Sequence, residues 1–293
     1  MSSTVRFDAA TQSSWDTVRL RVWRGTVPIF FSCPGHKAQL KLDVPRLSYL
    51  PLAFAKLREV FNLRGDAKIW LTTARKDHPR EVLLTHMPAG LLYDLHTTSI
   101  RDVAPLHLVV IDDEAVLPNS PTAPGEWPAP PRLSLQDEYA ILPLLWQTFK
   151  QALHLRLGSL RWLQSLTPSQ SAALQRALLM LDMTTTYDLG QRLLQSPLQS
   201  VPVRLCISSS VFLQMAVPLR TQGGVTTVKD CIAIRMPDMA ILLVDPQNHE
   251  AQVPGVLVYL HGAAVPLDTP LSDLLEEAAY ADAWLYFVLL PVG

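Results

Sequence analysis

The first part of the chain alternates between short apolar segments with the spacing of strands and apolar stripes with the spacing of helices. Leu40, Leu42 and Val44 recur at every second position, as on one face of a half-buried strand. Phe54, Leu57 and Phe61 recur at i, i+3 and i+7, which is typical of a helix. The pattern predicts strands over 26–32, 39–44, 67–73, 81–86 and 106–111, and helices over 51–61 and 89–95. Residues 17–23 also alternate, so their period alone favours a strand.

A proline-rich segment follows the last of these strands. It holds six prolines: Pro118, Pro121, Pro124, Pro128, Pro130 and Pro131. Proline lacks an N–H and biases the preceding residue against helical backbone angles. We therefore predict a semi-rigid linker over 118–133.

Three helices are predicted after this linker. The first runs from residue 134 or 135 to about 166, with Pro143 near its start expected to delay or kink it. The second begins at Thr167, where Thr167 and Gln170 form a capping-box pattern, and ends near residue 181. The third begins near Thr185 and is stopped by Pro197.

Strand patterns return after residue 200. They predict a hairpin over 203–208 and 212–219, a helix over 226–235, a strand over 255–261, a helix over 270–280 and a buried strand over 284–290. Both ends of the chain thus share the order hairpin, helix, strand, short elements, strand, which is the order of the β-grasp or ubiquitin-like fold. The predicted fold class is α+β, with two β-grasp domains (1–117 and 201–293) flanking a helix-rich domain (134–200).

Composition and charge narrow the classes of function. With 48% hydrophobic and 17% charged residues, the 293-residue chain has enough apolar material for folded cores. Its net charge is −1, whereas nucleic-acid-binding proteins are typically strongly basic, so no nucleic-acid partner is expected. The charge is uneven, however: residues 1–117 carry +3 and residues 201–293 carry −5.

The same composition indicates a location. The longest uncharged run, 251–267, is shorter than the roughly 20 apolar residues of a spanning helix, and no signal segment is visible at the N-terminus. Three widely separated cysteines favour a reducing compartment over a disulfide framework.

No catalytic or metal-binding motif is present in the sequence. It lacks GxSxG, GxxxxGK[ST], a GxGxxG after a strand and HExxH. Asp112, Asp113 and Glu114 at a strand end indicate a solvated turn. His107 and His261 lie within strand patterns and are interpreted as structural, and Cys206 and Cys231 as buried, inert thiols. We expect no enzyme activity, no cofactor and no metal; a soluble enzyme has no motif to support it.

One lysine stands apart from the others. Only seven lysines accompany 18 arginines, and Lys150 is the only lysine between Lys76 and Lys229. It lies in the first long helix, beside an apolar stripe that includes Trp146 and Phe149. Spacing alone fits an ordinary solvated lysine. The terminal Gly293, although shared with ubiquitin-like modifiers, follows the last strand too closely to form a threading tail, so we exclude a modifier.

Several runs of residues resemble the autophagy protein 5 family. The clearest are 256–262 (VLVYLHG), 265–271 (VPLDTPL) and 280–291 (YADAWLYFVLLP). Earlier runs are Trp23 to Gly25 before a strand, 42–46 (LDVPR) followed by Tyr49, and 88–94 (PAGLLYD). Each run is a weak motif alone, but in order and spacing they cover nearly the whole chain.

The resemblance implies two ubiquitin-like domains around a helix-rich domain, in agreement with the pattern of elements. It differs in one place: family members begin with a short helix, which implies that 14–23 is helical despite its alternation. We follow the resemblance here and predict a short N-terminal helix before the first ubiquitin-like domain.

The resemblance also implies a function. The segment 146–151 (WQTFKQ) matches the family's aromatic-x-x-aromatic-lysine pattern, which implies Lys150 as the acceptor of an isopeptide bond from autophagy protein 12. Implied partners are the N-terminal helix of the coiled-coil autophagy protein 16 and the conjugating-enzyme complex that transfers autophagy protein 8 to phosphatidylethanolamine. The implied location is cytoplasmic, with peripheral contact to the phagophore membrane. The alternative is a tandem ubiquitin-like adaptor that binds partners without being modified.

Overall fold

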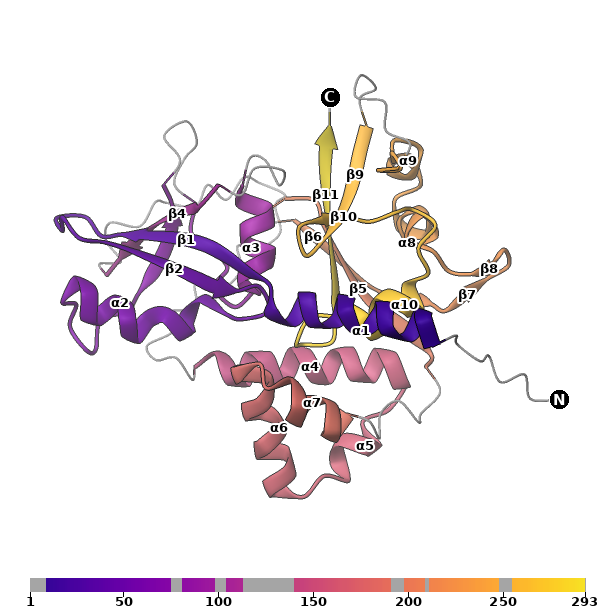
Figure 1. Cartoon of the computed structure of the whole chain (residues 1–293), viewed down its shortest axis with the longest axis horizontal. Coiled ribbons are helices and arrows are strands. Elements are labelled where there is room, and N and C mark those ends of the chain that lie inside the picture. Colours follow the sequence, from indigo (N-terminus) through magenta and orange to yellow (C-terminus); the bar gives the residue numbers. More distant parts are fainter. Residues whose placement is uncertain are drawn as a thin grey trace, which may run out of the picture.

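The computed structural model describes residues 9–74, 81–97, 104–112, 140–190, 198–208, 211–247 and 255–292. Two β-sheets, one on the left and one on the right of Figure 1, sit above a group of helices, and a single N-terminal helix crosses between them. The predicted linker over 118–133 lies outside the described residues, and the domain boundaries remain predictions.

The first sheet has four strands in the order β2-β1-β4-β3. Strands β1 (Thr26–Ser32) and β2 (Gln39–Pro45) form an antiparallel hairpin, β4 (Leu106–Ile111) runs parallel to β1, and β3 (Trp70–Thr73) closes the far edge. The 3₁₀ helix η1 (Leu50–Ala53) leads into α2 (Phe54–Phe61), and α3 (Ala89–His96) follows β3. Phe54, Leu57 and Phe61 are buried, as their spacing predicts.

The second sheet has five strands in the order β10-β9-β11-β5-β6. Its hairpin is β5 (Ser200–Cys206) and β6 (Phe212–Pro218); β11 (Leu285–Val292) runs parallel to β5, followed by β9 (Gly255–Leu260) and β10 (Ala263–Ala264). The helices are α8 (Val228–Arg235), α9 (Pro237–Ile241) and α10 (Leu271–Glu277), with the short hairpin β7 (Arg220–Thr221) and β8 (Gly224–Val225) before them. In each sheet the first strand of the hairpin pairs in parallel with the last strand of the domain: β1 with β4, and β5 with β11. The predicted α+β class with two β-grasp units is therefore confirmed.

Between the sheets in the sequence lie α4 (Ile141–Leu157), α5 (Arg161–Gln164), α6 (Pro168–Met180) and α7 (Met183–Gly190). The capping box at Thr167 is confirmed, because Thr167 and Gln170 exchange side-chain and backbone hydrogen bonds. The helix α4 begins at Ile141, later than residue 134 or 135, which agrees with the delay expected from Pro143. Pro143 lies in its first turn, where a backbone N–H has no intrahelical acceptor.

Two helix boundaries were predicted wrongly. The first helix does not continue to residue 166, because Gly158 adopts a left-handed conformation (φ 68°) and its N–H bonds to His154 O, which ends α4. The third begins at Met183, two residues early, because the Asp182 carboxylate accepts hydrogen bonds from Thr185 and caps it. Pro197 and residues 134–139 lie outside the described part of the chain.

The N-terminal helix that the family resemblance implied is confirmed, because residues 17–23 belong to α1 (Ala9–Arg24) despite their alternation. One strand prediction was wrong. The predicted strand 81–86 is reduced to an isolated bridge between Val82 and Thr72. The pairing with β3 stops after this bridge, because a turn closed by the hydrogen bond from Met87 N to Leu84 O directs the chain into α3.

Candidate functional site

Lys150 lies in the middle of α4, the helix that faces both sheets from below in Figure 1. Its side chain is half-buried, while Gln147, Gln151 and His154 around it are exposed. Trp146 lies one turn before Lys150 on the helix and stacks on the buried Phe149, with ring centroids 5.6 Å apart. Among the residues that the structure describes, none forms an ion pair or hydrogen bond with the Lys150 amine. The expected arrangement, an amine beside an apolar wall, is present; its role as an acceptor remains a prediction.

The second sheet anchors α4 close to this lysine. The indole Nε1–H of Trp284, which is fully buried, donates a hydrogen bond of 3.1 Å to Thr148 O, two residues from Lys150. Further along the helix, Ser200 Oγ donates to Leu155 O (2.6 Å) and Gln199 N donates to Arg156 O (2.8 Å). These bonds join α4 to the ends of β5 and β11 and fix the turn that carries Lys150.

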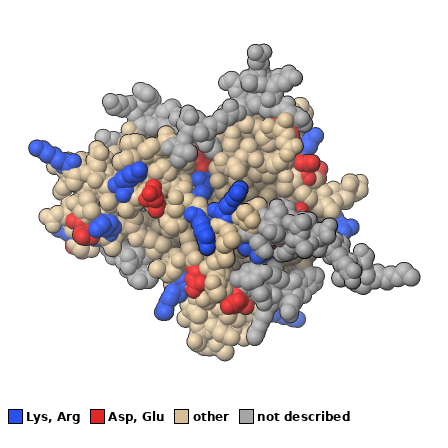
Figure 2. All heavy atoms as spheres, in the orientation of Figure 1, with Lys and Arg blue, Asp and Glu red and all other residues tan. Residues whose placement is uncertain are grey.

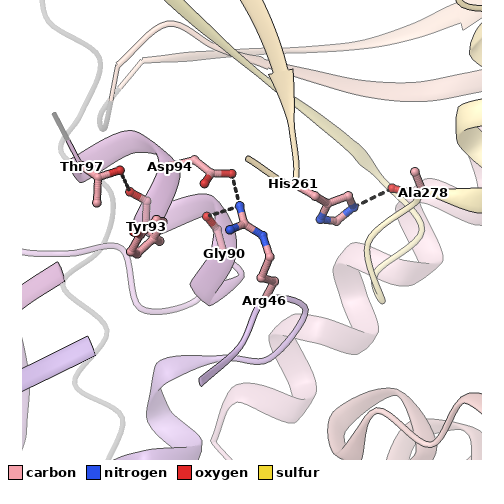
Figure 3. A network of polar contacts seen from close by, with 7 residues as sticks. All are labelled: Arg46, Gly90, Tyr93, Asp94, Thr97, His261 and Ala278. Atoms are coloured by element: carbon pink, nitrogen blue, oxygen red, sulfur yellow. Dashed lines mark hydrogen bonds and ion pairs between the residues drawn. The ribbon is translucent and has the colours of Figure 1, made fainter. Parts of the chain in front are cut away.

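Charged and polar side chains lie buried where the two sheets meet (Figure 3). Arg46, which follows β2, pairs with Asp94 of α3, and the backbone of Gly262 in the β9–β10 turn comes near enough to the Asp94 carboxylate to oppose the rise of its pKa. Gly262 has a positive φ of 77°, and a Cβ there would lie only 3.0 Å from the Arg46 guanidinium. A glycine is therefore required for the turn of the second domain to reach this pair.

Burial shifts the pKa of two groups in this junction in opposite directions. Desolvation raises the pKa of Asp94 from 3.8 to about 6, against the opposing effect of Arg46. Desolvation lowers the pKa of His261 from 6.5 to about 4. The His261 residue keeps some accessible surface, but its ring stacks on Tyr280 (centroids 4.1 Å apart), Nε2 bonds to Ala278 O, and Nδ1 is enclosed. The interpretation of His261 as structural agrees with this geometry.

A second polar network lies inside the other domain and faces the same junction. Arg204 donates to Tyr286 Oη (2.7 Å), Tyr286 donates to Asp282 (2.5 Å), and the Arg204 guanidinium lies 4.4 Å from the Trp284 ring. Burial raises the pKa of Asp282, while the Arg204 cation opposes the shift. Tyr49 of the first domain is fully buried beside these groups, so its ring belongs to the contact between domains.

None of these junction residues was predicted as a site, although the sequence held a signal for them. Arg46 ends the run LDVPR, Asp94 ends PAGLLYD, and His261 and Gly262 end VLVYLHG. Three runs that resemble the family in sequence thus meet at one place in space. Their burial and pairing fit a contact between the two domains.

The other residues considered from the sequence do not come together as a site. Cys33, Cys206 and Cys231 are buried thiols, and burial raises the pKa of Cys206 and of Cys231 to about 12, which fits inert thiols. His107 is exposed and stacks on Phe30, while Asp113, Glu114 and Gly293 lie outside the described residues. The described residues contain no group of histidine, cysteine and acidic side chains that could hold a metal ion, and none of their helices has the length and apolarity to cross a bilayer.

Surface charge is spread over the face shown in Figure 2, with basic side chains gathered near the middle where α1 crosses. Arg19 of α1 forms an ion pair with Glu277 of α10. The positive N-terminal part and the negative C-terminal part therefore face each other in at least this contact.

Comparisons with known proteins agree with this architecture. Residues 22–111 match the family model described as "Autophagy protein ATG5, UblA domain", and residues 200–289 match "Autophagy protein ATG5, UblB domain". The chain is 27% identical to autophagy protein 5 of Chaetomium globosum, over 90% of this chain and 86% of the relative. It is 25% identical to that of Aspergillus clavatus, over 96% of this chain and 99% of the relative.

A solved structure gives the same result for the fold. The crystal structure of Kluyveromyces marxianus Atg5 is similar with a TM-score of 0.71 and 18% identity, and the match covers 94% of this chain and all of that one. Both ubiquitin-like domains match the same family, their order is that of the family, and relatives align over almost their whole length. The chain belongs to the autophagy protein 5 family.

Proposed function

We propose that this protein is a scaffold of autophagic conjugation that is joined covalently, through Lys150, to the ubiquitin-like autophagy protein 12. The observation that carries the proposal is the state of the Lys150 amine. It is half-buried beside the Trp146 and Phe149 rings, has no ion-pair partner among the described residues, and lies on a helix turn that Trp284 holds in place. An acceptor amine needs both properties, since it must be reachable and its position must be defined.

The chemistry needs little from this chain. The neutral Lys150 amine attacks the carbonyl carbon of a thioester between the modifier's terminal glycine and a cysteine of the conjugating enzyme. A C–N bond forms, the C–S bond breaks, the thiolate leaves, and the amine loses a proton. Arginine cannot replace lysine, because its guanidinium stays protonated. The conjugating enzyme supplies the activated carbonyl, so we propose an acceptor and not an enzyme.

The proposed assembly follows from the family. The conjugate binds the N-terminal helix of autophagy protein 16 and, as a ligase-like factor, promotes the transfer of autophagy protein 8 to phosphatidylethanolamine during autophagosome formation. We propose that it acts in the cytoplasm, in peripheral contact with the phagophore membrane. The exposed basic side chains near α1 in Figure 2 support attraction to an anionic surface only modestly.

Reconstituted conjugation tests the proposal. The full chain, the modifier, its activating enzyme and its conjugating enzyme are incubated with ATP, and products are separated on a denaturing gel. We expect a band shifted by the mass of the modifier for the wild type and for Lys229→Arg, an exposed lysine on α8, and none for Lys150→Arg. A shift that persists in Lys150→Arg would move the acceptor to another lysine. No shift in any variant, with enzymes active on a control acceptor, would favour the unmodified adaptor.

A further inference from the structure

The two ubiquitin-like sheets differ at the edge formed by the second strand of each hairpin. In the first sheet that strand is β2, which exposes Lys41 and Asp43, and charged side chains of this kind protect an edge against pairing with another chain. In the second sheet it is β6, which has no charged residue from Phe212 to Pro218. The β5–β6 hairpin also exposes Ile207, Val211 and Phe212, at 37%, 43% and 39% of their surfaces.

The backbone of β6 is open on its outer side. Ile207 N donates to Val211 O (3.0 Å), which closes the hairpin ladder at this pair. Ladder bonds recur at every second pair of antiparallel strands, so Leu213, Met215 and Val217 bond to β5. The N–H and C=O groups of Phe212, Gln214 and Ala216 therefore point away from β5, and no strand in the described part of the chain pairs with them.

The open edge is short, and its length indicates the size of its occupant. It ends at Pro218, which has no N–H and whose carbonyl accepts a hydrogen bond from Thr226 Oγ1 (2.6 Å). From Phe212 to Ala216 a strand extends about 17 Å, at about 3.4 Å per residue. A stable pair of protein copies buries about 800 Å² on each side, more than five residues of edge supply. A short extended peptide fits this edge better than a second copy does.

The charge beside the edge indicates the chemistry of that peptide. Arg220, which is exposed, is the only charged residue from 211 to 228. The Arg204 guanidinium of β5 lies 5.7 Å from the Phe212 ring, but it is buried and already bonded to Gln214 and Tyr286, so Arg220 is the exposed charge next to this edge. We propose that β6 binds, by strand addition, a short extended peptide of a partner protein, with apolar residues at alternate positions and an acidic residue at the end that reaches Arg220.

The probe for this proposal is a phage-displayed library of random octapeptides, selected on the full chain. Selected sequences are synthesised, and their affinities are measured by fluorescence anisotropy. We expect alternating apolar residues with a terminal acid, and hydrogen-exchange protection on binding at the amides of Phe212, Gln214 and Ala216. Recovery of no peptide, or protection elsewhere on the chain, would overturn the proposal. So would a concentration-dependent dimer, in sedimentation, whose contact protects the same amides.

A matched pair of variants separates the backbone from the side chain. Gln214→Pro removes an N–H that points outward and leaves the ladder to β5 intact, as proline does on edge strands. We expect Gln214→Pro to weaken peptide binding at least tenfold. Gln214→Thr also removes the glutamine side chain but keeps the backbone N–H, so its affinity for the peptide should stay within about twofold of the wild type. Equal affinity of both variants for the peptide would contradict strand addition.

N-methylated peptides provide the same test without altering the protein. Methylation of the peptide amides that face β6 should abolish binding, and methylation of the alternate amides should not; the same effect at both sets would refute the pairing. Arg220→Glu should weaken binding of the acidic peptide and strengthen that of a version ending in lysine. Lys150→Arg should bind all of them like the wild type, so failure here is distinct from failure of the proposed conjugation.

Discussion

Asp94 and His261 at the junction are expected to make opposite contributions to the pH dependence of stability, which largely cancel in the wild type. Asp94 has a raised pKa in the folded chain, so its favourable contribution is complete below pH 3.8 and is lost as the pH rises to about 6. His261 has a lowered pKa, so its contribution is complete above pH 6.5 and is lost as the pH falls to about 4. The two contributions change in opposite directions over almost the same interval.

Their magnitudes are similar. Each shift is roughly two units, and one unit corresponds to about 1.4 kcal/mol, so each group changes the free energy of unfolding by on the order of 3 kcal/mol across the interval. In the wild type the changes largely cancel. Asp94→Asn removes the falling contribution and leaves that of His261, so its stability relative to the wild type should rise with pH. His261→Asn, whose asparagine tolerates the left-handed backbone at this position (φ 53°), should do the reverse.

The assay is urea unfolding of the wild type and both variants at several pH values between 4 and 7. Only the difference between each variant and the wild type is used, so that unrelated titrating groups cancel. The double variant, Asp94→Asn with His261→Asn, is the control and should differ from the wild type by a constant amount. Variant curves that run parallel to the wild type would refute the reasoning, because they would show that neither group is shifted by burial.

Two further substitutions test the contacts between domains, each with a matched control. Gly262→Ala should lower stability by about 1–3 kcal/mol, because a Cβ would meet the Arg46 guanidinium and strain the positive φ, whereas Gly65→Ala, with open space around it, should change the melting temperature little. Trp284→Phe removes the hydrogen bond to Thr148 O and should cost about 1–3 kcal/mol in denaturant unfolding, more than Trp162→Phe, whose indole N–H has no partner among the described residues. Equal effects within either pair would contradict the assigned contacts.

Local signals in the sequence were enough for much of the fold. The capping box at Thr167, the stripe of Phe54, Leu57 and Phe61, and the alternation of the β2 segment depend on neighbours within a few residues, and all three are confirmed. The end of α4 at Gly158 was missed, although a glycine after a basic last turn is typical of a helix terminus. For 17–23 the local pattern alone favoured a strand, and the helix was predicted only from the family resemblance, because alternation over seven residues does not exclude a helix.

Contacts between distant residues could not be predicted in this way. The spacing of Trp284 and Thr148 along the chain carries no information about the bond that joins them, and the same holds for Arg46 and Gly262. Sequence patterns identified Lys150 as isolated from other lysines and placed it beside an apolar stripe. They could not show that the second sheet holds its helix, because that depends on how the separate domains pack.

The buried charges at the junction affect the relative orientation of the two domains more than the free energy of unfolding. Burial of an ion pair such as Arg46 and Asp94 contributes little net free energy, because desolvation offsets the attraction between the charges. Breaking such a pair is different, since a buried charge without its partner costs about 3–5 kcal/mol. An arrangement of the domains that moved the Gly262 turn away would alter the packing around both charges. The network therefore favours one orientation of the two ubiquitin-like domains over others that bury equal apolar surface. The second of these domains also holds α4, through the hydrogen bond from Trp284 to Thr148 O.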